Sequence, residues 1–394
     1  MSKFTPKKLI PVTILTGFLG SGKTTLLNNI LNDNTHGMKF AVIENEFGEV
    51  GVDDRVLSEN VDEELIEVMN GCICCTVRGD LVVALKKLYE KIDQFDGIII
   101  ETTGLADPAP VCQTFFIDEG IQKMYQLDSV ITVADAKYIL ERLAEEKPEG
   151  VENESVEQVA FADKILLNKI DLVDEDMLVK IESKLKSLNP SAIVQRTERS
   201  KISPKDVLNL RAFELKRVLD FDPEFLAEDA EHQHDETVSS IAVKSEEPVN
   251  LAMLENWINR LIRTEGANLY RYKGIINVKG VDQKFIFQGV GMIFSGGFDN
   301  TTWKAREKRE NRFVFIGKNL DHEFYKTGFL ACREDKPLRF PVGTKVMANI
   351  GEFTPGIVLK HWDEGNAYRV ELEDGKQTNV WAPIDIDAYI KERN

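Results

Sequence analysis

A glycine-rich segment near the start of the chain has the residue types and the spacing needed to hold phosphate groups. Residues 17–24, GFLGSGKT, fit the pattern G-x-x-x-x-G-K-[ST]. The glycines let backbone N–H groups surround the phosphates, Lys23 brings a positive charge to the β and γ phosphates, and Thr24 offers a hydroxyl to Mg²⁺. A chance glycine-rich turn is the alternative, but an apolar strand pattern at 11–15 precedes the segment and a helical pattern at 23–31 follows it. This context predicts the phosphate loop of a nucleotide hydrolase.

A second segment supplies an acid and a glycine for the same site. Glu101 ends an apolar strand predicted at 97–100, where its carboxylate can order the Mg²⁺ shell or the attacking water. Gly104, three residues later, can approach the γ-phosphate through its N–H. Strands often end in acids, so this pattern gains its meaning from following a phosphate loop.

The sequence NKID at 168–171 follows a strand predicted at 164–167 and favours guanine as the base. Asp171 can accept both N1–H and the exocyclic N2–H of guanine, whereas adenine would present an acceptor to it, and the stem of Lys169 can cover the base plane. A polar loop after a strand is the alternative, but its place as the third motif in this order favours GTP over ATP. The residues expected to contact the nucleotide are Gly17, Gly20, Ser21, Gly22, Lys23, Thr24, Thr25, Gly104, Asn168, Lys169 and Asp171.

Three of the five cysteines lie together as Cys72, Cys74 and Cys75 in the sequence CICC. Free cysteines also pack well in cores, but three thiols within four residues after a turn do not resemble a strand that buries one face. Thiolate-rich ligation suits Zn²⁺, Cu(I) or an iron–sulfur cluster, and zinc is the commonest of these. Three sulfurs leave room for an exchangeable fourth ligand, which suits transfer of the metal better than a closed structural site.

Three carboxylates, Glu44, Glu46 and Glu49, follow a strand predicted at 40–43 and precede the cysteines. They could bind Mg²⁺, position water or complete a metal shell, and a solvated acidic loop is the alternative for each. The residues that we expect to be catalytic are Lys23, Glu101 and, from these three carboxylates, Glu46.

Composition limits the partners and the compartment. The 49 basic and 66 acidic residues give a net charge of −17, which repels phosphate backbones, so nucleic acid is not expected as a partner. No apolar stretch is long enough for a membrane span, and the first residues do not form a secretory signal. Few cysteines and no signal indicate reduced thiols and the cytosol.

The pattern of elements predicts three domains of different class. Apolar strands, with a further one at 129–133, alternate with helices at 23–31, 81–92 and 175–187, which predicts a mostly parallel sheet with helices on both faces over residues 1–219. Residues 220–237 form an acidic linker, whose His232 and His234 could buffer metal but are expected to be solvated. Residues 238–333, with a helix at 251–262 and strands at 239–243, 269–278, 284–290 and 312–316, predict a small α+β domain.

Residues 340–394 contain short strand patterns and predict an SH3-like or tudor-like barrel. The predicted strands are 345–350, 356–361, 368–372 and 379–382. Four aromatic residues of this domain could line a peptide-binding cage, but we expect them to form its own core. These residues are Phe353, Trp362, Tyr368 and Trp381.

The ordered motifs resemble those of the CobW-type P-loop GTPases, and specifically the branch of zinc-regulated GTPase metalloprotein activators. The resemblance rests on 17–24, on 44–49, on NGCICC at 70–75, on ETTGLADP at 101–108 and on NKID at 168–171, and LAEEKPEG at 143–150 also fits that branch. It covers about residues 8–333 and implies a P-loop NTPase fold followed by the family's smaller α+β C-terminal domain.

The resemblance implies that the protein uses GTP and Mg²⁺ to gate the transfer of Zn²⁺ to client metalloproteins. The family's metal ligands fall on Cys72, Cys74 and Cys75, and its additional carboxylate contacts are similar to Glu44 and Glu49. Two alternatives remain open: a GTPase that carries cobalt, nickel or iron for cofactor assembly, and a nucleotide-gated adaptor for protein partners whose cysteines are structural. An assembly of identical subunits is also left open.

Overall fold

The computed structural model describes residues 9–44, 65–67, 76–91, 94–148, 153–213, 238–304, 306–333, 337–363 and 366–393. The chain forms two compact units, Met1–Arg217 and Val218–Asn394, each with its own sheets. No helix in the described part of the chain combines the length and the apolar character needed to span a bilayer.

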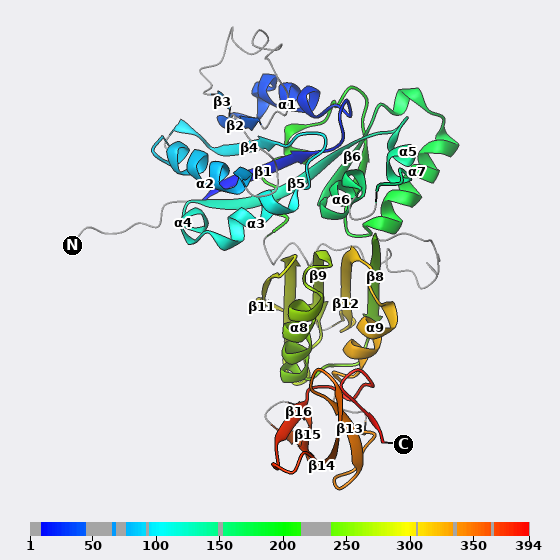
Figure 1. Ribbon diagram of the computed structural model, residues 1–394. Helices are drawn as coiled ribbons and strands as arrows, with labels where there is room; N and C mark the ends of the chain where they lie inside the picture. The colour runs from blue at the N-terminus through cyan, green and yellow to red at the C-terminus, as the bar shows by residue number, and fades with distance from the viewer. Residues whose placement is uncertain are drawn as a thin grey trace, which may run out of the picture. The chain divides into compact units, whose positions relative to one another are not determined.

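The first unit is built on a seven-stranded sheet in the order β3-β2-β4-β1-β5-β6-β7 (Figure 1). Every neighbouring pair of these strands is parallel, which confirms the predicted class of fold. Because the strands are parallel, their carboxyl ends meet along one edge, where doubly wound sheets bind ligands. The strands are β1 Ile10–Thr16, β2 Phe40–Glu44, β3 Leu65–Glu67, β4 Gly97–Glu101, β5 Tyr125–Asp135, β6 Lys164–Asn168 and β7 Ile193–Arg196.

Helices cover both faces of this sheet, as the alternating contacts of β6 show. Leu166 packs in a cluster with Leu26 and Ile30 of the first helix, whereas its neighbours Ile165 and Leu167 pack in a different cluster with later helices. The helices are α1 Lys23–Asn32, α2 Thr76–Tyr89, α3 Ala109–Ile117, α4 Glu119–Gln122, α5 Ile139–Leu143, α6 Glu154–Phe161 and α7 Glu175–Leu188. Helix α2 begins five residues before the predicted start at residue 81, and helices α3 to α6 were not predicted from the sequence.

The second unit begins with a five-stranded antiparallel sheet in the order β11-β10-β9-β12-β8. Two helices pack on this sheet, and Trp257 at the centre of the first contacts the rings of Phe313, Phe315 and Phe329. The elements are β8 Val238–Ser245, α8 Leu251–Glu265, β9 Leu269–Ile276, β10 Gln283–Val290, β11 Ile293–Thr302, β12 Asn311–Lys318 and α9 His322–Leu330.

The last part of the chain forms a second five-stranded antiparallel sheet in the order β16-β15-β14-β13-β17. Strand β13 also contacts β16, so the sheet curls back toward itself as a small barrel does. The strands are β13 Lys345–Asn349, β14 Phe353–Asp363, β15 Asn366–Leu372, β16 Asn379–Ala382 and β17 Ile390–Glu392.

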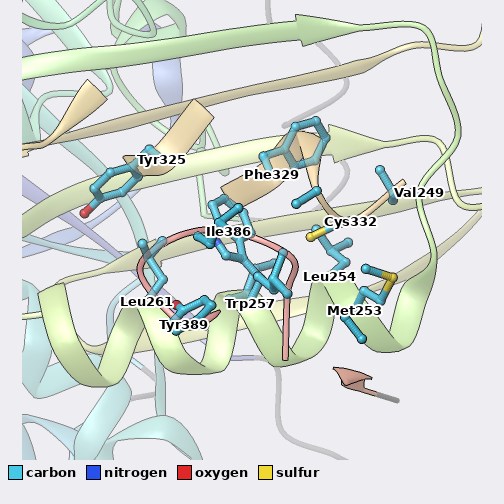
Figure 2. Packing of buried hydrophobic residues seen from close by; sticks show 14 of the residues in the cluster. Val249, Met253, Leu254, Trp257, Leu261, Tyr325, Phe329, Cys332, Ile386 and Tyr389 are labelled. Carbon is cyan, nitrogen blue, oxygen red and sulfur yellow. The ribbon is translucent and has the colours of Figure 1, made fainter. Parts of the chain in front are cut away.

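The two sheets of the second unit share one hydrophobic core. Figure 2 shows Ile386 and Tyr389, from the connection to β17, beside Trp257 and Leu261 of α8. The guanidinium of Arg260, also on α8, lies 3.8 Å from the centre of the Tyr389 ring. Helix α8 is therefore buried from two sides, by its own sheet and by the C-terminal strands.

The expectation that the aromatic residues of 340–394 form its core is wrong for two of the four. Tyr368 is fully buried, but Trp362 and Trp381 are 41% and 37% exposed. Phe353 is half-buried and carries the Lys391 ammonium 3.9 Å from its ring centre. Aliphatic residues at alternate positions of the strands, such as Val346 and Ala348, line the core instead. The Trp381 indole is held outside it, where its N–H donates to Oδ2 of Asp363 at 3.2 Å.

Candidate functional site

The phosphate loop joins β1 to α1 at the carboxyl edge of the sheet. Gly17 has φ +135° and Gly22 has φ +112°, conformations that residues with a side chain rarely adopt. A Cβ at Gly17 would lie 2.2 Å from the carbonyl oxygen of Val133, and one at Gly22 would lie 2.5 Å from Nδ2 of Asn168. The glycines therefore serve both the backbone path and the close packing of the loop on β5 and β6.

Lys23 is held inside this loop, although its side chain is charged. Its Nζ donates to the carbonyl oxygen of Gly17 at 2.8 Å, and the residue is only 7% exposed. Burial lowers the pKa of the Lys23 amine, and the negative charge of Glu101 partly offsets this effect. A phosphate anion beside the amine would favour its charged form.

Thr24 and Glu101, which the sequence predicts on one Mg²⁺ site, lie in direct contact. The Thr24 hydroxyl donates to Oε1 of Glu101 at 2.8 Å, and Thr24 and Thr25 are both exposed. In the register of the sheet, Glu101 at the end of β4 pairs with Glu44 at the end of β2. The parallel sheet thus brings together a hydroxyl and a carboxylate that are separated by 77 residues.

The loop after β4 packs directly on the phosphate loop. A Cβ at Gly104 would come within 2.4 Å of the backbone nitrogen of Leu19, so only glycine allows this approach. The Thr102 N–H donates to the carbonyl oxygen of Leu15 at 2.9 Å, which fixes the start of the loop against β1. Gly104 is therefore next to the loop expected to hold the phosphates.

The segment at the end of β6 is tied to the phosphate loop by its first two residues. Nδ2 of Asn168 donates to the carbonyl oxygen of Ser21 at 2.9 Å. Nζ of Lys169 donates to the carbonyl oxygen of Gly20 at 2.7 Å and to Oδ2 of Asp135 at 2.7 Å. Asp171 follows in a short 3₁₀ helix, Ile170–Leu172, and is exposed, so its carboxylate is accessible to a base.

Three residues that hold this site were not predicted from the sequence. Asp135, at the end of β5, is 2% exposed and pairs with Lys169. Thr197 and Ser200, just beyond β7, donate to Oδ1 of Asn168 from a hydroxyl at 3.2 Å and a backbone N–H at 2.8 Å. The signal that could have found them is position, because each lies at or just beyond the carboxyl end of a strand of the parallel sheet.

The residues at this edge fit a nucleotide with its Mg²⁺. Backbone N–H groups at the start of α1 and the Lys23 amine suit the phosphates, and Thr24 with Glu101 offers the oxygen ligands that Mg²⁺ prefers. Oγ of Ser21 is buried without a hydrogen-bond partner in the described part of the chain, as expected for a group that awaits a ligand.

The predicted zinc ligands cannot be placed in the same way. Cys72, Cys74, Cys75, Glu46 and Glu49 lie outside the described residues. The remaining cysteines, Cys112 and Cys332, are both buried. Nothing in the described ranges groups three or more histidine, cysteine or acidic side chains as a metal site.

Two family models match the chain on either side of residues 197–237. Residues 11–196 match the CobW/HypB/UreG nucleotide-binding domain, and residues 238–333 match the C-terminal domain of the cobalamin synthesis protein cobW. The chain belongs to the CobW family. The resemblance inferred from its motifs is thereby confirmed, and its first unit contains the nucleotide-binding domain of that family.

Curated relatives of this CobW-family chain carry zinc in their names. The zinc chaperone YjiA of Escherichia coli is 38% identical over 330 residues, which are 82% of this chain and 99% of that protein. Zinc-regulated GTPase metalloprotein activator 1 of Dictyostelium discoideum is 34% identical over 71% of this chain and 68% of its own length. The crystal structure of the Zn(II)-bound YjiA GTPase from E. coli superposes with a TM-score of 0.68 at 34% identity, and the match covers 83% of this chain and all of that one.

Proposed function

We propose that this protein binds and hydrolyses GTP and uses that cycle to control a zinc ion that it delivers to client metalloproteins. The observation that carries the proposal is the contact between Thr24 and Glu101, 2.8 Å, beside the buried Lys23. This contact joins the start of α1 to the end of β4, where the γ-phosphate of a nucleotide on the loop would lie. The names of the relatives support zinc as the cargo.

Guanine is the base that the β6 edge suits best. Asn168 and Lys169 are locked to the phosphate loop by their side chains, so the chain enters the 3₁₀ helix that carries Asp171 from a fixed point. A carboxylate at Asp171 would accept two N–H groups from guanine and would face an acceptor on adenine. We therefore infer GTP as the substrate.

Hydrolysis would use the charges at this edge. Bound Mg²⁺ neutralises phosphate charge and orients the phosphates, as in other phosphate-loop enzymes. Lys23 would hold the β and γ phosphates, Gly104 would donate its N–H to the γ-phosphate, and Glu101 or Glu46 would orient the attacking water. None of the residues that we assign to this site is an arginine, so we expect slow turnover without a partner.

The position of the cysteines supports coupling between nucleotide and metal. The chain leaves β2 at Glu44, which is in register with Glu101 of β4 and with Glu67 at the end of β3, and α2 begins at Thr76, directly after Cys75. The cysteines thus follow a strand that ends at the nucleotide edge, and we infer that the γ-phosphate acts on them as it acts on the switch segments of GTPases. We propose Glu44 and Glu49 as supporting ligands and the cytosol as the compartment that keeps the thiols reduced.

The test is zinc binding by a variant with Cys72, Cys74 and Cys75 changed to serine. We expect this variant to lose tight zinc binding and to keep GTP hydrolysis at its basal rate. Cys112 and Cys332 remain in the variant as an internal control for other thiols, and both are buried. Unchanged zinc affinity would refute the site.

A second candidate, a nucleotide-gated adaptor for protein partners, is favoured by the exposed indoles of Trp362 and Trp381. The same variant separates the two functions, because structural cysteines would lower thermal stability when replaced. Metal analysis of protein purified without a tag distinguishes zinc from cobalt, nickel or iron.

A further inference from the structure

Gln158 connects a helix of the first unit to the loop that follows β4. Its side chain is 1% exposed, and its Nε2 donates to the carbonyl oxygens of Gly104 and Ala106, both at 3.2 Å. A primary amide has two N–H donors, so this group is fully used by the two bonds. Neither partner belongs to a helix or strand, so the bonds act on the part of the loop beyond Thr102, whose N–H is bonded to β1.

The same loop is confined on another side by the phosphate loop. Gly104 packs so closely on Leu19 that a Cβ would lie 2.4 Å from the Leu19 nitrogen and 2.8 Å from its Cα. Gly104 is therefore held between Gln158 and the phosphate loop. A shift of this residue needs either the loss of the amide bonds or a movement of Leu19.

The bonds to Gln158 also set the direction of the loop's peptide groups. In a trans peptide the C=O and N–H point to opposite sides, so a Gly104 carbonyl directed at α6 turns the Leu105 N–H away from α6. Within the described residues, the N–H groups of Gly104 and Leu105 have no hydrogen-bond partner in the protein. Both donors remain free to bind an anion at the edge of the phosphate loop.

Helix α6 is a firm support for this arrangement. The Thr132 hydroxyl of β5 donates to the backbone carbonyl of Gln158 at 2.6 Å. At the end of the helix, Nδ2 of Asn189 donates to the carbonyl oxygens of Val159, Ala160 and Ala162 at 2.9, 3.1 and 2.8 Å. The loop is thus fixed to a helix that is itself fixed to the central sheet.

We propose that Gln158 is a positioning residue that holds Gly104 and Leu105 where their N–H groups meet the γ-phosphate, and that it thereby sets the preference for GTP over GDP. The inference rests on the proposed function, because it takes the ligand at this edge to be a guanine nucleotide. GDP lacks the γ-phosphate, so its affinity depends on the phosphate loop and on the β6 segment and not on Gln158.

The test compares Gln158→Met, which keeps the shape of the side chain and removes both donors, with Asn189→Leu as a matched control. Asn189 supports the same helix through three carbonyl bonds but does not touch the loop. The affinities for GDP and for a non-hydrolysable GTP analogue are measured with each protein. For Gln158→Met we expect the affinity for the analogue and kcat to fall roughly 10- to 100-fold, while the GDP affinity stays within about threefold.

Asn189→Leu is expected to lower thermal stability and to leave the ratio of the two affinities unchanged. An equal loss for both nucleotides in Gln158→Met, or no loss, would overturn the role of Gln158. Gln158→Glu, whose carboxylate would repel the two carbonyls, replaces Gln158→Met if that variant does not fold, with the same expected result.

Hydrogen exchange on nucleotide-free protein separates this inference from the proposed function. Gln158→Met should speed amide exchange over 102–107, and unchanged exchange there would overturn the inference without any reference to GTP. A wild-type protein that bound no guanine nucleotide would instead refute the proposed function. In that case, faster exchange in Gln158→Met would show only that Gln158 supports the loop, and the proposed selectivity for GTP would be contradicted.

Discussion

Replacing Gly22 with alanine tests how firmly the phosphate loop is held to the base-recognition segment. Gly22 has φ +112°, and a Cβ there would lie 2.5 Å from Nδ2 of Asn168 and 2.8 Å from Oγ of Ser200. Asn168 is 2% exposed, so its amide cannot move aside without losing its bonds to Ser21 and Ser200. Gly20 provides the matched control, since it has φ +80° and nothing within 4 Å of an added Cβ.

The magnitude follows from counting what each change disturbs. An alanine in left-handed backbone costs about 1–2 kcal/mol, and this cost applies to both Gly20→Ala and Gly22→Ala. Gly22→Ala also breaks the two bonds donated by Nδ2 of Asn168, at about 1 kcal/mol each. We therefore expect Gly22→Ala to destabilise the first unit by about 2 kcal/mol more than Gly20→Ala does, or roughly 30-fold in the unfolding equilibrium.

The assay is urea unfolding of nucleotide-free protein, followed by far-UV circular dichroism and by tryptophan fluorescence. All four tryptophans, Trp257, Trp303, Trp362 and Trp381, lie beyond residue 237, so their fluorescence reports the second unit and serves as an internal control. Only the circular dichroism transition of the first unit should shift. Equal shifts for the two alanine variants would refute the close packing of Gly22 on Asn168.

Three further changes test other parts of the structure. Asp171→Asn should weaken GTP binding roughly 10- to 100-fold and improve binding of xanthosine triphosphate, measured by competition, and an unchanged preference would contradict guanine recognition. Burial raises the pKa of Asp128, so the folded state binds more protons than the unfolded state between pH about 4 and that raised pKa. Wild type should therefore lose stability relative to Asp128→Asn as the pH rises to 7. A stability difference in urea unfolding that does not change with pH would contradict this. Tyr389→Ala should cost about 3 kcal/mol in the tryptophan-detected transition, because Tyr389 is buried against α8, whereas exposed Leu359→Ala should cost less than about 1 kcal/mol.

The sequence predicts the central sheet well because its strands are buried on both faces and read as continuous apolar runs. Residues 164–167 are an example, and β6 extends them by one residue to Asn168. Helix α6 was missed because it is short and partly polar, and its first turn depends on Asn153, whose side chain accepts from the N–H groups of Ser155 and Val156. Strand β11 was missed because it is an exposed edge that contains Gly296 and Gly297, and its pairing with β10 defines it.

Some residues of the candidate site belong to contiguous motifs and could be predicted from the sequence, whereas others act through contacts with distant residues and could not. The phosphate loop and the segment at 168–171 are contiguous motifs, so their chemistry can be inferred from the chain alone. Gln158 and Ser200 act by bonds to backbone carbonyls far away in the sequence, as when Oγ of Ser200 donates to Gly22 across 178 positions. No local pattern records such a partner, and only the folded sheet brings these groups to one edge.

The most direct measurement of the central claim is the zinc affinity of the full chain in two nucleotide states. The protein is loaded with Mg²⁺ and either GDP or a non-hydrolysable GTP analogue, and the variant lacking Cys72, Cys74 and Cys75 gives the background. We predict at least a roughly tenfold difference in zinc affinity between the two states, because, as proposed, the γ-phosphate acts on the segment that carries the cysteines. Equal affinities would contradict the account, because a nucleotide that does not distinguish the metal-binding states cannot control delivery of the metal.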